Sequence, residues 1–136
     1  MGNHRRRFLI VSCFVVFLAA CALPVIRVSD YTRDDSQVVV YRDERFNIRL
    51  DANWTTGYSW RLENTYRRDI VLFVGNKYVD PNFSDTTYNI VGAAGYEIWT
   101  FHALKRGKTV LDFYYSRTWD TAGLPSKVYK TSVIVR

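Results

Sequence analysis

Seven short apolar runs at regular spacing along residues 37–136 constrain the fold more than any other feature of this sequence. Within a run, side chains alternate in polarity; Phe46, Ile48 and Leu50, for example, are separated by polar residues. This period of two predicts β-strands, and no stretch of twelve residues carries a helical period. The expected strands are Gln37–Tyr41, Arg45–Leu50, Tyr58–Leu62, Ile70–Val74, Ile98–Leu104, Thr109–Tyr115 and Lys127–Val135.

Turn-forming residues separate these runs. They are Arg42-Asp43, Gly75-Asn76, Asp80-Pro81-Asn82, Arg106-Gly107 and Gly123-Leu124-Pro125. Seven short strands rich in aromatic and β-branched residues predict an all-β fold, an immunoglobulin-like β-sandwich. The expected core is Phe46, Ile48, Trp60, Leu62, Leu72, Trp99, Phe101, Leu111, Phe113 and Val133.

The N-terminal residues have the features of a targeting segment. A basic stretch, Arg5–Arg7, precedes an apolar stretch, Phe8–Leu18, which is too short to span a membrane and is typical of a signal peptide over residues 1–20. The sequence Leu18-Ala19-Ala20-Cys21 resembles the lipobox of bacterial lipoproteins, in which the cysteine is lipidated. The alternative is an ordinary signal peptide with a chance cysteine.

A lipidated Cys21 implies a protein of the bacterial cell envelope, anchored in the membrane by its lipid. The non-acidic Ala22 that follows is typical of sorting to the outer membrane, facing the periplasm, if the host is Gram-negative. We expect residues 21–36 to form a tether, because they are polar and charged. The alternative for part of this segment is an edge strand at Val25–Val28.

Removal of residues 1–20 leaves 116 residues, the size of one domain, which we place at residues 37–136 and expect to be a monomer. It also changes the charge balance. The formal net charge falls from +6 to +3 because the signal contains three arginines and no acid. No more than two basic residues are adjacent in the remainder, so nucleic-acid binding gains no support. Cys13 leaves with the signal, so no disulfide can form within one mature chain.

The sequence offers few reagents for catalysis. His102 is the only histidine after the signal, and a lone histidine in a strand is typical of a surface or core-edge residue. There is no nucleophile elbow of the G-x-S-x-G type, no Cys/His spacing for zinc and no glycine-rich phosphate loop. We therefore expect neither an enzyme nor a bound metal or cofactor.

Three connections contain more than turn chemistry requires. The first is Asn53-Trp54-Thr55-Thr56-Gly57-Tyr58, in which Gly57 alone would supply positive φ. Two threonines and a tryptophan at this tip predict either a presented binding loop or a loop whose Trp54 folds back onto the edge of the sandwich.

The other two connections are Gly92-Ala93-Ala94-Gly95 and Arg117-Thr118-Trp119-Asp120. The first gives a backbone that a partner can approach closely, and the second supplies two residue types enriched at interface hot spots. Taken singly, the glycines are explained by a flexible turn and Trp119 by a cap on the core.

Together the three segments resemble the chagasin-type inhibitors of papain-like cysteine proteases. That family shows N-P-T-T-G-[YF], G-x-G-G and R-P-W in this order on an immunoglobulin-like sandwich, and this chain has NWTTGY, GAAG and RTWD. The departures are Trp54 for proline, Ala94 for glycine and Thr118 for proline.

The resemblance implies an inhibitor whose three loops form a wedge across the protease cleft. It implies that Thr55, Thr56 and Gly57 lie against the catalytic cysteine and histidine, with Asn53 and Tyr58 in the same protease-binding loop. Gly92, Ala93, Ala94 and Gly95 would lie beside the non-primed subsites, and Arg117, Thr118 and Trp119 on the primed side. Trp54 is either a second aromatic anchor or a residue that restricts the target range. The alternative function is an adhesive or structural envelope lipoprotein, because β-sandwiches serve many functions.

Overall fold

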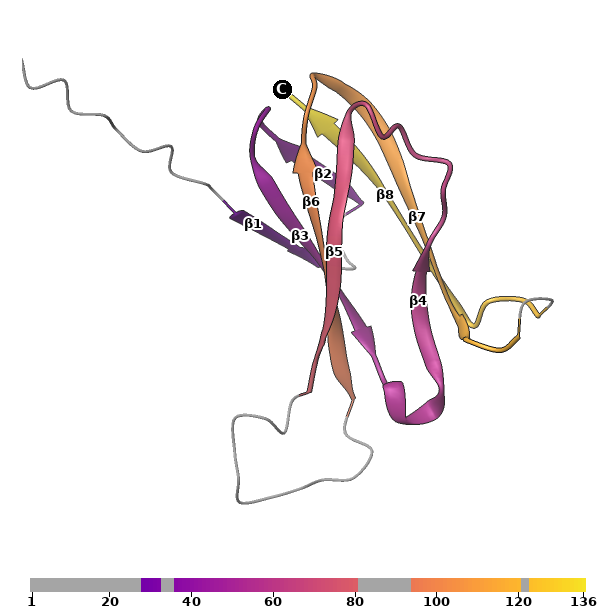
Figure 1. Ribbon diagram of the computed structural model, residues 1–136. Coiled ribbons are helices and arrows are strands. Elements are labelled where there is room, and N and C mark those ends of the chain that lie inside the picture. The colour runs from indigo at the N-terminus through magenta and orange to yellow at the C-terminus, as the bar shows by residue number, and fades with distance from the viewer. Residues whose placement is uncertain (1–27, 33–35, 81–93, 121–122) are drawn as a thin grey trace, which may run out of the picture.

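The protein is described by a computed structural model that covers residues 28–32, 36–80, 94–120 and 123–136 (Figure 1). Two four-stranded sheets pack face to face. The elements are β1 (Val28–Thr32), β2 (Gln37–Val40), β3 (Arg45–Ala52), the 3-10 turn η1 (Trp54–Thr56), β4 (Tyr58–Leu62), β5 (Val71–Val79), β6 (Gly95–Ala103), β7 (Gly107–Arg117) and β8 (Lys127–Val135). Among these residues, no helix is long and apolar enough to cross a membrane. The predicted all-β sandwich is confirmed.

The strand order is β1-β3-β6-β5 in one sheet and β2-β8-β7-β4 in the other. The first strand of each sheet pairs in parallel, β1 with β3 and β2 with β8, and all other pairs are antiparallel. The chain passes from one sheet to the other through η1, while β5–β6 and β7–β8 are hairpins within a sheet.

Aromatic side chains from both sheets form the core. Phe46 and Phe101 stack with their ring centroids 5.4 Å apart, and Phe113 meets Phe101 edge to face across the two sheets. Of the ten residues expected in the core, eight are buried and Leu62 is half-buried against them. The prediction that Leu72 lies in the core is wrong. Its side chain is 45 % exposed because its neighbours Val71 and Phe73 occupy the inward positions of β5.

Two further expectations are wrong. The tether expected over residues 21–36 contains β1, which adds an edge strand to the first sheet. Tyr31 explains why, since its ring meets Phe46 edge to face at 6.4 Å and its hydroxyl donates to the carbonyl of Val39 at 2.8 Å. The edge-strand alternative was right in kind, but β1 begins at Val28, where that alternative ended. The signal peptide and Cys21 lie outside the described residues.

The turn expected at Gly75-Asn76 is also wrong. Strand β5 continues through both residues to Val79, and the register shifts between Phe73 and Gly75. A β-bulge thus replaces the turn, which agrees with the tolerance of glycine at such positions.

Strand register places three connections at the same end of the sandwich. Ala52 pairs with Gly95, Val79 with Tyr96 and Tyr58 with Arg117. The ends of β3, β5 and β7 and the first residues of β4, β6 and β8 therefore lie at the same end of the sandwich, the lower end in Figure 1. We call this the loop end.

Candidate functional site

The β3–β4 loop is a single turn closed by its own polar side chains. Asn53 caps η1, and its Oδ1 accepts hydrogen bonds from the backbone N–H of Thr55 at 3.1 Å and from the Thr55 hydroxyl at 2.6 Å. The Thr56 hydroxyl donates to the carbonyl of Asn53 at 2.6 Å. Gly57 ends the turn at a positive φ of 74°, as predicted, and its N–H donates to the backbone carbonyl of Trp54 at 3.0 Å. Every polar residue of the motif thus holds the shape of the turn.

The turn is also fastened to the sandwich beneath it. The N–H of Asn53 donates to the Tyr115 hydroxyl at 2.8 Å, and Tyr115 is buried. Tyr58 stacks on the Tyr115 ring at 5.4 Å. The loop is therefore positioned by a rigid side chain of the second sheet, although its own residues Thr55 and Thr56 remain exposed.

Trp54 folds back onto the edge of the first sheet. Its ring stacks on Tyr78 of β5 with centroids 4.6 Å apart, and its Nε1 donates to Oε1 of Glu97 at 2.9 Å. Half of the side chain, 50 %, still faces solvent. The folded-back alternative is thus confirmed, and the same tryptophan also presents apolar surface at the loop end.

Glu97 is the site residue that sequence reasoning missed. This glutamate is 1 % exposed and accepts three hydrogen bonds, from Trp54 Nε1, from the backbone N–H of Trp60 at 3.2 Å and from Trp99 Nε1 at 3.1 Å. A buried carboxyl group needs such hydrogen-bond partners. The signal was available, because the alternation of β6 places residue 97 on the same inward face as Trp99 and Phe101.

The β7–β8 loop lies directly against the β3–β4 loop. The N–H of Thr118 donates to the carbonyl of Gly57 at 3.3 Å, and the Trp119 ring covers Gly57 so closely that a Cβ there would lie 2.6 Å from its Cζ3 atom. The guanidinium of Arg117 lies 5.3 Å from the centre of the Tyr58 ring and 6.0 Å from that of Trp119. Trp119 is 67 % exposed, so it does not cap the core.

The glycine segment is described only in part. Gly92 and Ala93 lie outside the described residues, Ala94 is exposed, and Gly95 is the buried first residue of β6. A Cβ at Gly95 would lie 2.6 Å from Cζ of Tyr78, the ring on which Trp54 stacks. Gly95 therefore makes room for the backbone carbonyl of Val79 on the paired strand β5 and for the Tyr78 ring that supports the first loop.

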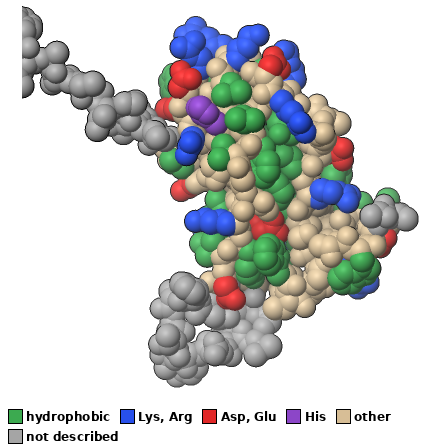
Figure 2. Space-filling model, in the orientation of Figure 1, with side chains coloured by type: hydrophobic (Ala, Val, Ile, Leu, Met, Phe, Trp, Pro, Cys, Tyr) green, Lys and Arg blue, Asp and Glu red, His purple; other side chains and the backbone are tan. Residues whose placement is uncertain are grey.

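The chemistry available at this end is that of a binding surface. Exposed Trp54, Thr55, Thr56, Arg117 and Trp119 share it, and Figure 2 shows hydrophobic side chains exposed there. Within the described ranges, no three His, Cys, Asp or Glu residues are grouped to hold a metal. His102 lies on β6, half-buried, and pairs with Arg45 at the end of β3 opposite the loop end.

Gly57→Val is expected to disturb this arrangement strongly. A β-branched residue is strained at φ 74° by roughly 1–3 kcal/mol, and its side chain would displace Trp119. Urea denaturation would measure the fall in unfolding free energy. Gly75→Val is the matched control, since nothing lies within 4 Å of a Cβ there. Equal stability of the two variants would contradict the contact between the loops.

The family described as Chagasin family peptidase inhibitor I42 matches residues 39–133. No curated protein sequence matches the chain.

Several solved structures share the fold. The crystal structure of the cysteine protease inhibitor EhICP2 from Entamoeba histolytica is 23 % identical, covers 83 % of this chain and 99 % of its own, and has a TM-score of 0.65. The ICP of Leishmania mexicana is 26 % identical, covers 76 % of this chain and 90 % of its own, and has a TM-score of 0.52. PbICP-C in complex with falcipain-2 is 15 % identical, covers 81 % of this chain and 88 % of its own, and has a TM-score of 0.50.

Proposed function

The chain belongs to the chagasin family of peptidase inhibitors, and from this premise we propose that it is a reversible, tight-binding inhibitor of papain-like cysteine proteases. Members of this family are inhibitors and not enzymes. The class of target is supported by EhICP2, itself a cysteine protease inhibitor, and by PbICP-C, which was solved with falcipain-2.

One observation carries the proposed mechanism: Trp119 of the third loop rests on Gly57 of the first. Two loops far apart in sequence thereby present one continuous surface. Because hydrogen bonds and stacking already fix both loops, little ordering entropy is lost when a partner binds. An interface of standard size then suffices for tight inhibition.

In this proposal the turn Trp54–Thr56 and Gly57 enter the cleft above the catalytic cysteine and histidine. Trp119 and Arg117 pack on the primed side, and the segment 92–95 lies beside the non-primed subsites. The turn is closed by the Asn53 cap and the N–H of Gly57, so it offers no extended scissile peptide to the nucleophile. Resistance to cleavage would follow from this shape.

The direct test is the inhibition constant of the purified protein against papain and a small panel of related proteases. We expect competitive, reversible inhibition with no loss of intact inhibitor on long incubation. A well-folded protein that inhibits none of them would overturn the proposal and favour an adhesive or structural envelope lipoprotein instead.

Substitution of Trp54 would distinguish its two expected roles. Its ring is held by Tyr78 and Glu97, so it cannot swing aside without breaking a stack and a hydrogen bond. Trp54→Pro should therefore widen the range of inhibited proteases if the ring clashes in narrow clefts. A uniform loss of affinity across the panel would make Trp54 a second anchor.

We further propose that the protein is lipidated at Cys21 and held in a bacterial envelope as a monomer. The support is the sequence Leu18-Ala19-Ala20-Cys21 after a complete signal. Cys21→Ser is expected to abolish acylation and to move the protein from the membrane to the soluble fraction. Unchanged fractionation of this variant would argue against a lipid anchor.

A further inference from the structure

The end of the sandwich opposite the loop end is rich in basic side chains. It is formed by the β2–β3 turn, the β4–β5 connection, the β6–β7 turn and the last residue, which backbone hydrogen bonds join. The backbone N–H of Arg42 donates to the carbonyl of Arg136 at 2.9 Å, and that of Asp43 to the carbonyl of Ala103 at 2.8 Å. The backbone N–H of Leu104 donates to the carbonyl of Ile70 at 2.8 Å. Its exposed cations, which we call the basic end, are Arg42, Arg45, Arg67, Arg68, Lys105, Arg106, Lys108 and Arg136.

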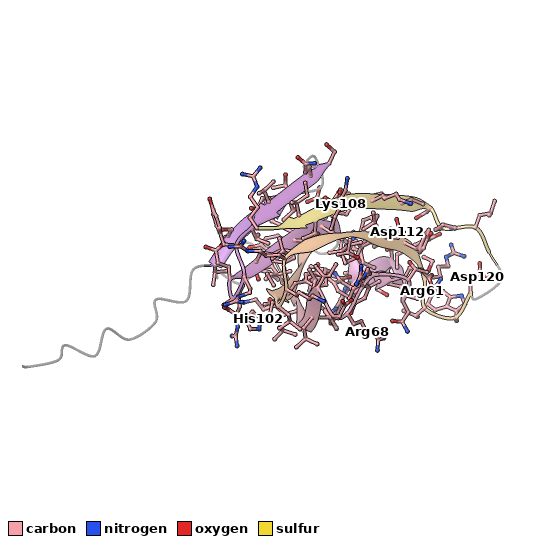
Figure 3. All side chains as sticks on the ribbon, turned by 90° about the horizontal axis from the view of Figure 1, so that it is seen from above. Arg61, Arg68, His102, Lys108, Asp112 and Asp120 are labelled. Atoms are coloured by element: carbon pink, nitrogen blue, oxygen red, sulfur yellow. The ribbon has the colours of Figure 1, made fainter. Side chains whose placement is uncertain are left out.

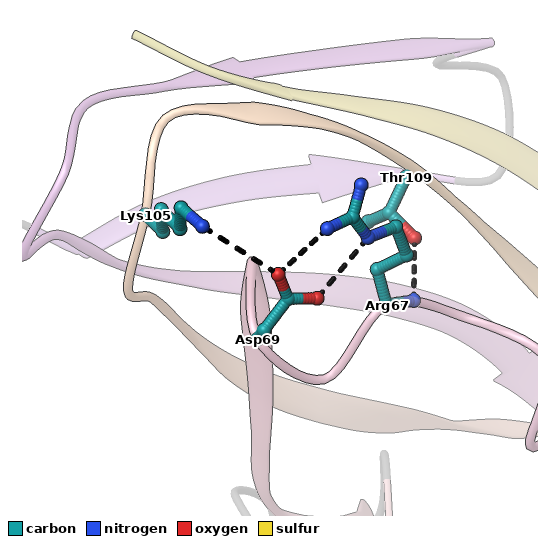
Figure 4. Close-up of polar contacts among 4 residues, drawn as sticks. All are labelled: Arg67, Asp69, Lys105 and Thr109. Carbon is teal, nitrogen blue, oxygen red and sulfur yellow. Dashed lines mark hydrogen bonds and ion pairs between the residues drawn. The ribbon is translucent and has the colours of Figure 1, made fainter.

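The acidic residues of these connections, Asp43, Glu44, Glu63 and Asp69, offset only some of these charges. Asp43 pairs with Arg42 at 3.1 Å, and Asp69 pairs with Arg67 at 2.7 Å and with Lys105 at 4.0 Å (Figure 4). The hydrogen bond from Arg67 holds the pKa of the Asp69 carboxyl below its usual value, so Asp69 stays ionised at neutral pH.

The remaining cations form the excess charge. Among the described residues, no ion pair involves Arg45, Arg68, Arg106, Lys108 or Arg136. Figure 3 views the molecule from above this end and shows Lys108 and Arg68 on opposite sides of the sandwich, and blue side chains gather at the top of Figure 2. The loop end lacks this excess, since Arg117 and Lys127 there are offset by Asp51, Asp80 and Asp120.

The N-terminal part of the chain enters the fold at the same end. Val28, the first residue of β1, pairs with Arg45, and both strands then run toward the loop end. Six residues lie between Cys21 and Val28, so a fully extended chain places these two residues at most about 25 Å apart. A lipid on Cys21 would therefore keep the basic end close to the bilayer.

From these observations we infer that the basic end binds an anionic phospholipid surface, with the inhibitory loops directed away from it. Basic residues near such a surface are attracted to its headgroups, and the attraction falls off within a Debye length of about 8 Å. Strand β3 connects the two ends through eight residues, so the loop end stands roughly 25 Å from the bound face. A membrane-bound domain would then remain open to a protease.

The test is partition of the full, unlipidated chain between buffer and vesicles. Vesicles of phosphatidylglycerol and phosphatidylcholine in equal amounts are compared with vesicles of phosphatidylcholine alone. The apolar N-terminal stretch contributes equally to both, and the basic stretch Arg5–Arg7 contributes the same anionic preference in wild type and in every variant, so differences between these proteins measure the folded domain. We expect a preference for the anionic vesicles that falls steeply as salt is added. Equal partition into both vesicles would overturn the inference.

Two variants of equal charge locate the binding surface. Lys105→Gln/Arg106→Gln/Lys108→Gln should reduce the anionic preference by at least tenfold, since each basic residue near the surface contributes about fivefold. Arg61→Gln/Lys77→Gln/Lys127→Gln removes three exposed cations from elsewhere and should change it less than about threefold. Equal losses would mean that net charge alone acts.

Two further measurements complete the design. Near-ultraviolet circular dichroism checks that the aromatic core of each variant is intact. Heparin at matched charge concentration is added to vesicle-bound wild type; complete displacement would assign the basic end to soluble acidic polymers and overturn the membrane inference. Because partition is measured without a protease, this result is independent of whether the chain inhibits one.

Discussion

Replacing Trp119 with alanine is expected to raise the inhibition constant against papain by roughly 30- to 800-fold, the equivalent of about 2–4 kcal/mol for an interface tryptophan. The side chain is 67 % exposed in the free protein, so burying it against a protease would contribute to the binding free energy. Its position is already fixed by Gly57 beneath it and Arg117 beside it. The variant should unfold at nearly the same urea concentration as wild type.

Leu124→Ala is the matched control for Trp119. Leu124 belongs to the same β7–β8 connection and is 96 % exposed, but no contact ties it to the first loop among the described residues. We expect its inhibition constant to stay within about threefold of wild type, as for interface residues outside a hot spot. Equal effects of the two substitutions would mean that the third loop has no anchor residue.

Glu97→Leu is expected to lower the free energy of unfolding by about 2–5 kcal/mol. The substitution removes the acceptor of three N–H groups, and those of Trp60 and Trp99 lie inside the fold. Urea denaturation followed by tryptophan fluorescence would show a lower midpoint. The slope with urea should be unchanged, since the surface exposed on unfolding is the same.

Glu97→Gln and Asp51→Asn separate the causes of that loss. The glutamine keeps the shape of the side chain and one acceptor oxygen, so its stability should lie between wild type and the leucine variant. Asp51 is an exposed acid on the neighbouring strand, and its substitution should change stability by no more than about 0.5 kcal/mol. A leucine variant as stable as Asp51→Asn would show that Glu97 does not hold the tryptophans.

Glu97→Leu should also weaken inhibition, because Trp54 loses its hydrogen bond to Oε1. Loss of affinity beyond that of Trp54→Ala would mean that the buried glutamate positions more of the loop than this one ring. Measuring inhibition well below the unfolding midpoint keeps the two effects apart.

Local patterns were enough to predict the fold, and the residues show why. Alternation in Phe46, Ile48 and Leu50, or in Leu111 and Phe113, reflects burial of one face of a strand, which the sequence records directly. The prediction that Leu72 is buried failed because β5 is an edge strand with a bulge, where an apolar side chain can face solvent. Strand β1 was missed because its stability comes from distant partners, such as the carbonyl of Val39 that accepts from Tyr31.

The site was predictable as a set of residues but not as an assembly. The order of the three motifs identified Gly57 and Trp119, yet no local pattern says that one lies on the other. The link from Gly95 through Tyr78 and Trp54 to Glu97 joins four positions on three elements. Such contacts depend on register between strands, which the sequence does not state.

The aromatic core has a consequence for the redox conditions in which the protein works. A papain-like protease is active only while its nucleophilic cysteine is a reduced thiolate. Residues 28–136 contain no cysteine, and rings such as Phe46, Phe101 and Phe113 join the two sheets where many small secreted domains use a disulfide. The reductant that activates the protease therefore leaves the fold of its inhibitor intact, and an oxidant that inactivates the enzyme finds no thiol in the sandwich to modify.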